Sequence, residues 1–203
     1  MKTESPSNGL TLRVHLADGS TESFHQPDAE SAQKIRASLE PAQIFAKPRL
    51  VVAGAHFKSV YVPAHILRLD VIQAAEAHWQ FPGGYSDVVE LTESEFRQQS
   101  RLDQPEAMVR RDQPTAVGDL LVSFLKLHMA GGRSYYLMIE FPVKLPGENH
   151  SFLHFMLSKN ALHLRLRDGG YGIVNLANLV GYTVYPGVAE LPADALIAEK
   201  ILP

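Results

Sequence analysis

The chain has 203 residues, of which 45% are hydrophobic and 20% are charged, a composition typical of a globular protein with one large domain or two small ones. Its formal net charge of −3 excludes a general electrostatic attraction to nucleic acid or to anionic lipid. It contains no cysteine, which excludes disulfides, thiolate chemistry and zinc–thiolate sites, and no apolar run approaches the ~20 residues that span a bilayer.

Residues 1–9 lack the apolar stretch of a signal peptide and are expected to form a disordered lead-in. The first module, residues 10–72, begins with a strand, because apolar and polar residues alternate from Leu10 to Leu16. Asp18-Gly19 then predicts a tight turn. The rest of the module is predicted to hold a returning strand at 21–24, a helix at 28–39 and strand segments at 44–45, 50–52, 56–62 and 66–72.

Residues 73–119 form an acidic connector, since the stretch 72–119 holds nine acidic and four basic residues. A strand is expected at 87–91. Thr92 and Glu95 have the spacing of a capping box, in which each side chain accepts a hydrogen bond from the other residue's amide, and this pattern predicts a short helix over 93–101. We expect the connector to wrap around the outside of the two modules that it joins.

The second module, residues 120–187, repeats the strand pattern of the first. Gly131-Gly132 and Gly169-Gly170 predict hairpin turns, because glycine adopts positive φ without strain. Residues 151–157 are apolar on both faces and fit either a strand or a helix, and we favour a short buried helix. Strands are expected at 135–143, 162–166, 171–174 and 179–185, followed by a tail at 188–203 with a helical turn at 193–199 that docks through Leu196 and Ile197.

Three segments recur in the same order in the two modules. The segment that starts at Leu12 recurs at Leu125, and the segment that starts at Ala64 recurs at Ala177 with the same offset, which we call the repeat shift. The segment 45–52 recurs at 157–164, one position short of that shift. A module of about 60 residues buries little apolar surface alone. We therefore expect an α+β, strand-dominated fold in which two tandem pseudo-symmetric modules, each a hairpin, a helix and a three-stranded antiparallel meander, share one core.

The histidines are the first candidates for chemistry. His15 and His128 occupy equivalent positions in the two copies, away from the apolar face of their strands. They fit a symmetric pair of ligands or bases, or equally a solvent-facing position inherited by duplication or a contact with the other copy. His150 and His154 are four residues apart, which places them on one face if that segment is helical, and Glu148 is nearby. This group is a candidate metal site, although the spacings of known zinc motifs are missing.

A basic strand face is the second candidate. His163, Arg165 and Arg167 alternate with leucines on one predicted strand face, with Arg133 and Lys159 near them in the expected fold. Such a patch fits an anion, a nucleotide or an acidic partner. An antiparallel sheet normally leaves one face in solvent, so a solvated charged face explains the same residues.

The sequence lacks the nucleophile motifs of hydrolases and presents no carboxylate pair suited to general acid–base work. We therefore predict a non-enzymatic binding or assembly module in a bacterial-type cytoplasm, with a homo-oligomer, a dimer first, as the main partner arrangement. A protein partner or a small ligand between the copies comes next, whereas nucleic acid and membranes are not expected. The alternatives are an enzyme with a histidine-based, metal-assisted site and a binder of anions, nucleotides or nucleic acid. Their candidate residues are, respectively, His128, His150, His154 and His163, and Arg133, Lys159, Arg165 and Arg167. No particular cofactor is indicated.

Overall fold

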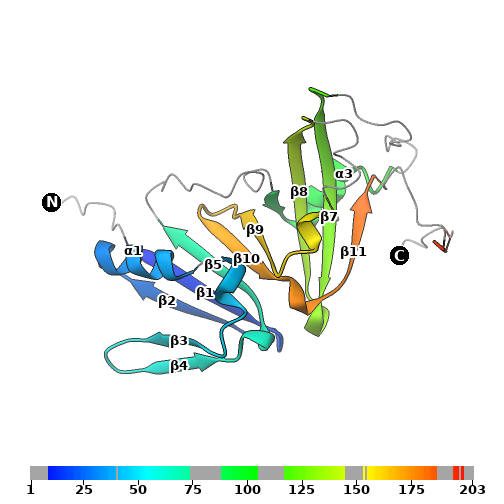
Figure 1. Ribbon diagram of the computed structural model, residues 1–203. Helices are drawn as coiled ribbons and strands as arrows, with labels where there is room; N and C mark the ends of the chain where they lie inside the picture. Colours follow the sequence, from blue (N-terminus) through cyan, green and yellow to red (C-terminus); the bar gives the residue numbers. More distant parts are fainter. Residues whose placement is uncertain are drawn as a thin grey trace.

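The computed structural model describes residues 9–39, 41–73, 88–104, 117–144, 153, 155–186, 194–196 and 198. These residues form an α+β structure dominated by strands (Figure 1). Their strands are β1 (Leu10–Leu16), β2 (Thr21–Gln26), β3 (Leu50–Ala53), β4 (Lys58–Tyr61), β5 (Ile66–Gln73), β6 (Val88–Leu91), β7 (Leu120–Met129), β8 (Ser134–Pro142), β9 (Ala161–Arg165), β10 (Tyr171–Asn175) and β11 (Leu179–Tyr185). Their helices are α1 (Ala29–Ser38), α2 (Pro41–Ile44) and α3 (Glu93–Ser100), with 3-10 turns η1 (Pro63–His65), η3 (Ala130–Gly132) and η4 (Leu176–Asn178).

The described strands form one large mixed sheet and one small antiparallel sheet. The large sheet has nine strands in the order β11-β7-β8-β6-β9-β10-β5-β1-β2, and β3 and β4 pair only with each other. The order of elements is the same in both halves: a hairpin, a helical segment, a second hairpin, a 3-10 turn and a last strand. The expected three-stranded meander is wrong, because the last strand of each half does not pair with the hairpin that precedes it. β5 pairs with β1, and β11 pairs with β7.

Part of the connector, which we expected to wrap around the outside, lies within the large sheet. Its strand β6 enters the middle of the large sheet, antiparallel to β8 and parallel to β9. The short stretch Val88–Leu91 carries two valines and a leucine, and Val88 is fully buried in the sheet. All four residues of β6 pair with β8, whereas the pairing with β9 is limited to Val89 and Arg165. The connector is therefore part of the framework that joins the two halves.

The described residues contain two hydrophobic clusters in place of the single shared core that we expected. One is built mainly on β7, β8 and β9, and the other mainly on β1, β5, α1 and the β3–β4 hairpin. Neighbouring residues of β10 belong to different clusters, Val174 to the first and Ile173 to the second. Because successive side chains of a strand point to opposite faces, the two clusters lie on opposite sides of the sheet at β10. The central strands are consequently buried on both faces.

Helices α1 and α3 begin where their capping residues predict, whereas the strand expected at 44–45 is wrong, because Ile44 belongs to helix α2. Asp28 accepts a hydrogen bond from the amide of Ser31 at the start of α1. Thr92 and Glu95 form the predicted capping box of α3, with both reciprocal hydrogen bonds present. Leu153 and residues 155–157 are helical, and Leu153 and Met156 are buried, which agrees with the short buried helix that we favoured.

Helix α3 covers one face of the second half through a single aromatic side chain. Phe96 is 1% exposed, and its ring lies 6.0 Å from that of Phe124, 5.1 Å from that of Tyr136 and 5.9 Å from that of Tyr185. These partners belong to β7, β8 and β11, so the helix spans three strands. In the tail, Leu196 is 97% exposed, so the expected docking through this residue is wrong, and Ile197 lies outside the described residues.

Candidate functional site

A cluster of buried polar side chains lies between the two halves of the large sheet. Arg68 and Asp70 of β5 are 6% and 1% exposed although both carry charge. Asp70 accepts hydrogen bonds at 2.6 Å and 2.9 Å from the Arg68 guanidinium and lies 2.7 Å from Nε2 of His15 on β1. Arg68 also donates to Glu90 of β6 at 2.5 Å, and its Cζ lies 4.8 Å from the ring centre of Tyr135 on β8.

This cluster shows that the large sheet curls. β9 and β10 lie between β5 and β6 in the sheet order, yet Arg68 of β5 and Glu90 of β6 are in direct contact. Gly172 of β10 leaves room for the carboxylate, because an added Cβ would lie 3.1 Å from Oδ1 of Asp70. The cluster therefore joins β1 and β5 of the first half to β6 and to β8 of the second half.

The electrostatics of the cluster favour a structural role as a buried ion-pair network over a role in acid–base chemistry. Burial alone would raise the pKa of Asp70, but hydrogen bonds from His15 and Arg68, together with their charges, hold this pKa below the usual value of a carboxyl group. A general base has a pKa near the working pH and lies within reach of substrate. Asp70 is 1% exposed and already accepts from the Arg68 guanidinium, so we assign it a structural role.

The turns at the ends of the two halves also touch. Arg133, next to η3, donates a hydrogen bond to the carbonyl oxygen of Gly19, and its Nη1 lies 3.4 Å from Nδ1 of His15. Gly131 has a φ of 75°, and an added Cβ would lie only 2.0 Å from the carbonyl oxygen of Ala17. Glycine is therefore required here both by conformation and by the close approach of the two backbones.

Two of the predicted histidines occupy matching positions on different strands. His15 has a side chain 12% exposed and contacts Asp70, so it does not face solvent as one of our alternatives had it. His128 of β7 places Nε2 at 3.3 Å from Oγ1 of Thr183 on β11. The sequence separation is 55 residues in both pairs. Both histidines thus link the first strand of a half to its last strand.

The histidines of the proposed enzyme site are separated where the structure describes them. His163 lies on β9, and β8 and β6 stand between that strand and β7, which carries His128. His163 is 6% exposed, and burial lowers its pKa to about 4, so its imidazole is neutral at pH 7. His150 and His154 lie outside the described residues, as does Glu148.

The four predicted anion-binding residues have different surroundings. Arg133 contacts the β1–β2 turn, Arg167 forms an ion pair with Glu95 of α3 at 2.9 Å, and the Nζ of Lys159 lies 3.9 Å from the ring centre of Phe155. Arg165 is exposed at the end of β9. The expected basic face also included His163, which is buried instead, because the second hydrophobic cluster covers that side of β9 and β10. The alternation of apolar and polar residues along β9 could not predict that this side of the strand is buried.

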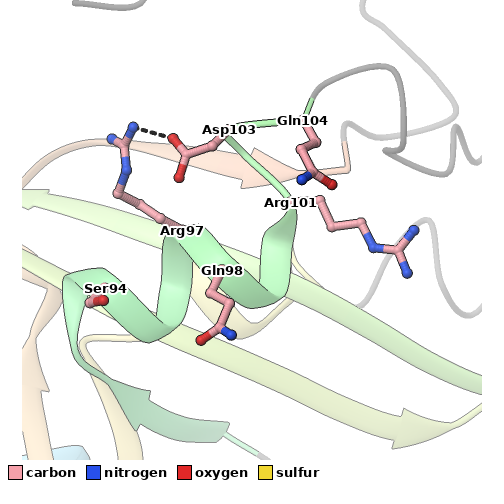
Figure 2. A pocket seen from close by; sticks show the side chains of 6 residues that line it. All are labelled: Ser94, Arg97, Gln98, Arg101, Asp103 and Gln104. Carbon is pink, nitrogen blue, oxygen red and sulfur yellow. Dashed lines mark hydrogen bonds and ion pairs between the residues drawn. The ribbon is translucent and has the colours of Figure 1, made fainter.

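A hollow lies beside α3 and the turn that follows it (Figure 2). Its volume is about 740 Å³, and it is lined by Ser94, Arg97, Gln98, Arg101, Asp103 and Gln104. Arg97 and Asp103 form an ion pair with each other. The lining offers guanidinium, amide and hydroxyl groups with a single carboxylate, and we assign no reaction to it.

β11 and the β3–β4 hairpin expose apolar side chains at the borders of the sheets, and sequence reasoning did not single them out. β11 is an outermost strand of the large sheet, and its Val180 and Tyr182 are 74% and 49% exposed. In the β3–β4 hairpin, Val51 and Val60 are cross-strand partners and are 49% and 51% exposed. The available signal was the absence of any charged residue from 179 to 185, since edge strands usually carry charge.

Among the described residues, no group of three or more histidine, aspartate or glutamate side chains is arranged to hold a metal ion. In the same residues, no helix combines the length and apolar character needed to cross a bilayer. No protein-family model, curated protein or solved structure matches the chain. The candidate functional surfaces are therefore judged on their own geometry.

Proposed function

We propose that this chain is a non-enzymatic assembly module, built from an internal duplication, that associates with copies of itself through an open sheet edge. The observation that carries the proposal is the composition and exposure of β11. This seven-residue strand contains no charged residue, pairs on one side with β7 and has no described strand on its other side. Natural sheet edges are usually protected from pairing by charges or proline, and β11 has neither within its bounds.

The other outermost strand makes the contrast clear. β2 exposes four of its six residues and carries Glu22 and His25 among them. On β11, the exposed apolar residues are Val180 and Tyr182, at 74% and 49%. Covering apolar side chains on association is favourable, and main-chain hydrogen bonds between edge strands supply the geometry. An assembly partner therefore fits β11 better than β2.

The duplication is supported by matching contacts at one sequence offset. The 3-10 turns η1 and η4 start at Pro63 and Leu176, which are related by the repeat shift that takes Leu12 to Leu125. The contacts His15–Asp70 and His128–Thr183 are related by the same shift. Two related units offer related strand edges, and a contact between unlike edges of two copies can repeat from copy to copy.

The proposal is tested by size-exclusion chromatography with light scattering over a wide range of concentrations. We expect wild-type protein to populate a discrete dimer or a larger species, and we expect Val180→Lys to shift the population toward monomer. Val180 is 74% exposed, so the substitution leaves the core intact. Val117→Lys, at a valine 57% exposed that lies outside β11, is the matched control and should associate like wild type. A wild-type protein that is monomeric at every concentration would contradict the proposal.

A further inference from the structure

The contact between the two halves of one chain supplies a pattern for a contact between chains. Inside the chain, β10 of the second half pairs antiparallel with β5, the last strand of the first half. The partners are Tyr171 and Val71, Gly172 and Asp70, Ile173 and Leu69, and Val174 and Arg68. The β9–β10 hairpin of the second half thus extends the sheet of the first half. Among the described residues, the β3–β4 hairpin of the first half does not extend the sheet of the second half in return.

Within the described part of the chain, each strand that would make the reciprocal contact has one edge without a strand partner. Under the repeat shift, Tyr171–Val174 corresponds to 58–61, which is β4, and 68–71 corresponds to 181–184 within β11. Among the described residues, β4 pairs only with β3, and β11 pairs only with β7. Figure 1 shows the β3–β4 hairpin and β11 at opposite ends of the molecule, so the two do not meet within one chain.

We propose that β4 of one copy pairs antiparallel with β11 of the next copy and so repeats the β10–β5 contact between chains. This inference rests on the proposed assembly function and names its interface. The intrachain register, moved by the repeat shift in each strand, sets the partners. They are Lys58 with Val184, Ser59 with Thr183, Val60 with Tyr182 and Tyr61 with Gly181, and the register extends to Val62 with Val180.

The exposed side chains support this register. Val60 and Tyr182 are 51% and 49% exposed, and Val62 and Val180 are 41% and 74% exposed. Each of these four apolar residues therefore meets another exposed apolar residue, and two cross-strand pairs form on a surface that is otherwise open to water. Gly181 has no atom within 4 Å of an added Cβ, which leaves space opposite Tyr61.

Charge favours this head-to-tail contact over a contact between two hairpins. The segment 45–62, which contains the hairpin, has three basic residues, Lys47, Arg49 and Lys58, and no acidic residue, although the whole chain has a net charge of −3. If two hairpins paired with each other, Lys58 of one copy would lie near the basic residues of the other hairpin, and like charges would repel. β11 carries no charge and imposes no such repulsion. Each copy then has one hairpin end and one β11 end, and such heterologous contacts generate rings or filaments.

The test uses two charge substitutions that block different ends. Val60→Glu blocks the hairpin end, and Tyr182→Glu blocks the β11 end. Each variant alone should self-associate about tenfold or more weakly than wild type, since an unpaired carboxylate is placed in the contact. An equimolar mixture retains one intact contact, β4 of the Tyr182→Glu chain with β11 of the Val60→Glu chain. Light scattering should therefore show a one-to-one dimer in the mixture and nothing larger.

Val117→Glu, at an exposed valine outside both strands, is the control and should leave assembly unchanged. Circular dichroism checks that each variant is folded. Wild type that associates while Val60→Glu associates equally well overturns the head-to-tail contact and leaves the assembly function standing. Wild type that associates while both variants and their mixture stay monomeric also overturns it, because the intact β4 and β11 strands of the two chains then fail to pair. A monomeric wild type removes the assembly function itself.

Discussion

Asp70 lies 2.7 Å from Nε2 of His15, across the antiparallel pair formed by the first and last strands of the first half. At the same positions of the second half, Thr183 lies 3.3 Å from Nε2 of His128. The first pair is part-buried, and Arg68 links its Asp70 to Glu90 of the connector strand β6. The second pair has a neutral hydroxyl in place of the carboxylate and lies on the strand whose other edge has no described partner. The matching positions thus contribute to an ion-pair network in the first half, whereas in the second half they lie beside an uncharged edge strand.

Asp70 is expected to be essential for stability. Asp70→Asn removes the charge that faces Arg68 inside the protein, and breaking a buried pair in this way typically costs roughly 3–5 kcal/mol of unfolding free energy. Asp168→Asn is the control, because Asp168 also pairs with an arginine but its side chain is 62% exposed. That change should cost ~1 kcal/mol or less. Urea unfolding at pH 7 measures both, and equal losses in the two variants would show that the buried ion-pair network contributes little.

The contribution of Asp70 should also depend on pH. Its pKa in the folded protein is below the ordinary value of 3.8, so the folded state favours the ionised form more than the unfolded state does. The resulting stabilisation is complete above the ordinary pKa and is lost as the pH falls toward the folded-state pKa. The difference in stability between wild type and Asp70→Asn should therefore shrink when unfolding is repeated below pH 4. A difference that grows on acidification would contradict the assigned direction.

Gly131 is expected to tolerate no side chain. Gly131→Ala places a methyl group 2.0 Å from the carbonyl oxygen of Ala17, so the turns of the two halves must separate. Gly132→Ala is a matched control, because Gly132 also has positive φ but no atom within 4 Å of an added Cβ. The control should lose only the ~1–2 kcal/mol that a left-handed conformation costs a residue with a Cβ. Thermal unfolding should rank Gly131→Ala clearly below Gly132→Ala, and equal melting temperatures would mean that the turns are not pressed together.

His163 is expected to make the protein sensitive to acid. Burial lowers the pKa of its imidazole from 6.5 to about 4, so the unfolded chain binds a proton that the folded chain resists. As far as His163 is concerned, the free energy of unfolding is therefore at its full value above about pH 6.5. It falls by roughly 3 kcal/mol as the pH approaches 4. His163→Leu should flatten this part of the stability profile. His25→Leu, at an exposed histidine, corrects for the loss of one histidine and should leave the profile steep.

The local structure was predictable wherever residues close together in the sequence determine it. The strand from Leu10 to Leu16, the helix after Asp28 and the capping box of α3 all follow from alternation, caps and turn residues, and the structure contains each of them. The positive φ values of Gly131, Gly132, Gly169 and Gly170 also agree with the predicted turns. These features depend on neighbours within a few residues, which a single sequence displays directly.

Strand partners and burial were not predictable in the same way. The periodicity of Leu179–Tyr185 indicates a strand, but it does not say that the strand pairs with β7 instead of β10. His163 and Arg165 alternate with leucines in the pattern of a half-exposed strand, and His163 is nevertheless buried by residues from the other half of the chain. Arg68 and Asp70 interrupt the apolar strand Ile66–Gln73, which was a visible signal of a buried ionic group that our sequence reasoning did not use.

By itself, the sequence determined most of the strands, the helices α1 and α3, the glycine turns and the repeat shift that relates the two patterns. Only the tertiary structure decided which strands became neighbours, which histidine met a carboxylate and which edges stayed open. The physical reason is that pairing and burial depend on the curl of a nine-stranded sheet, which brings together side chains from strands far apart in the chain. No local pattern encodes that geometry.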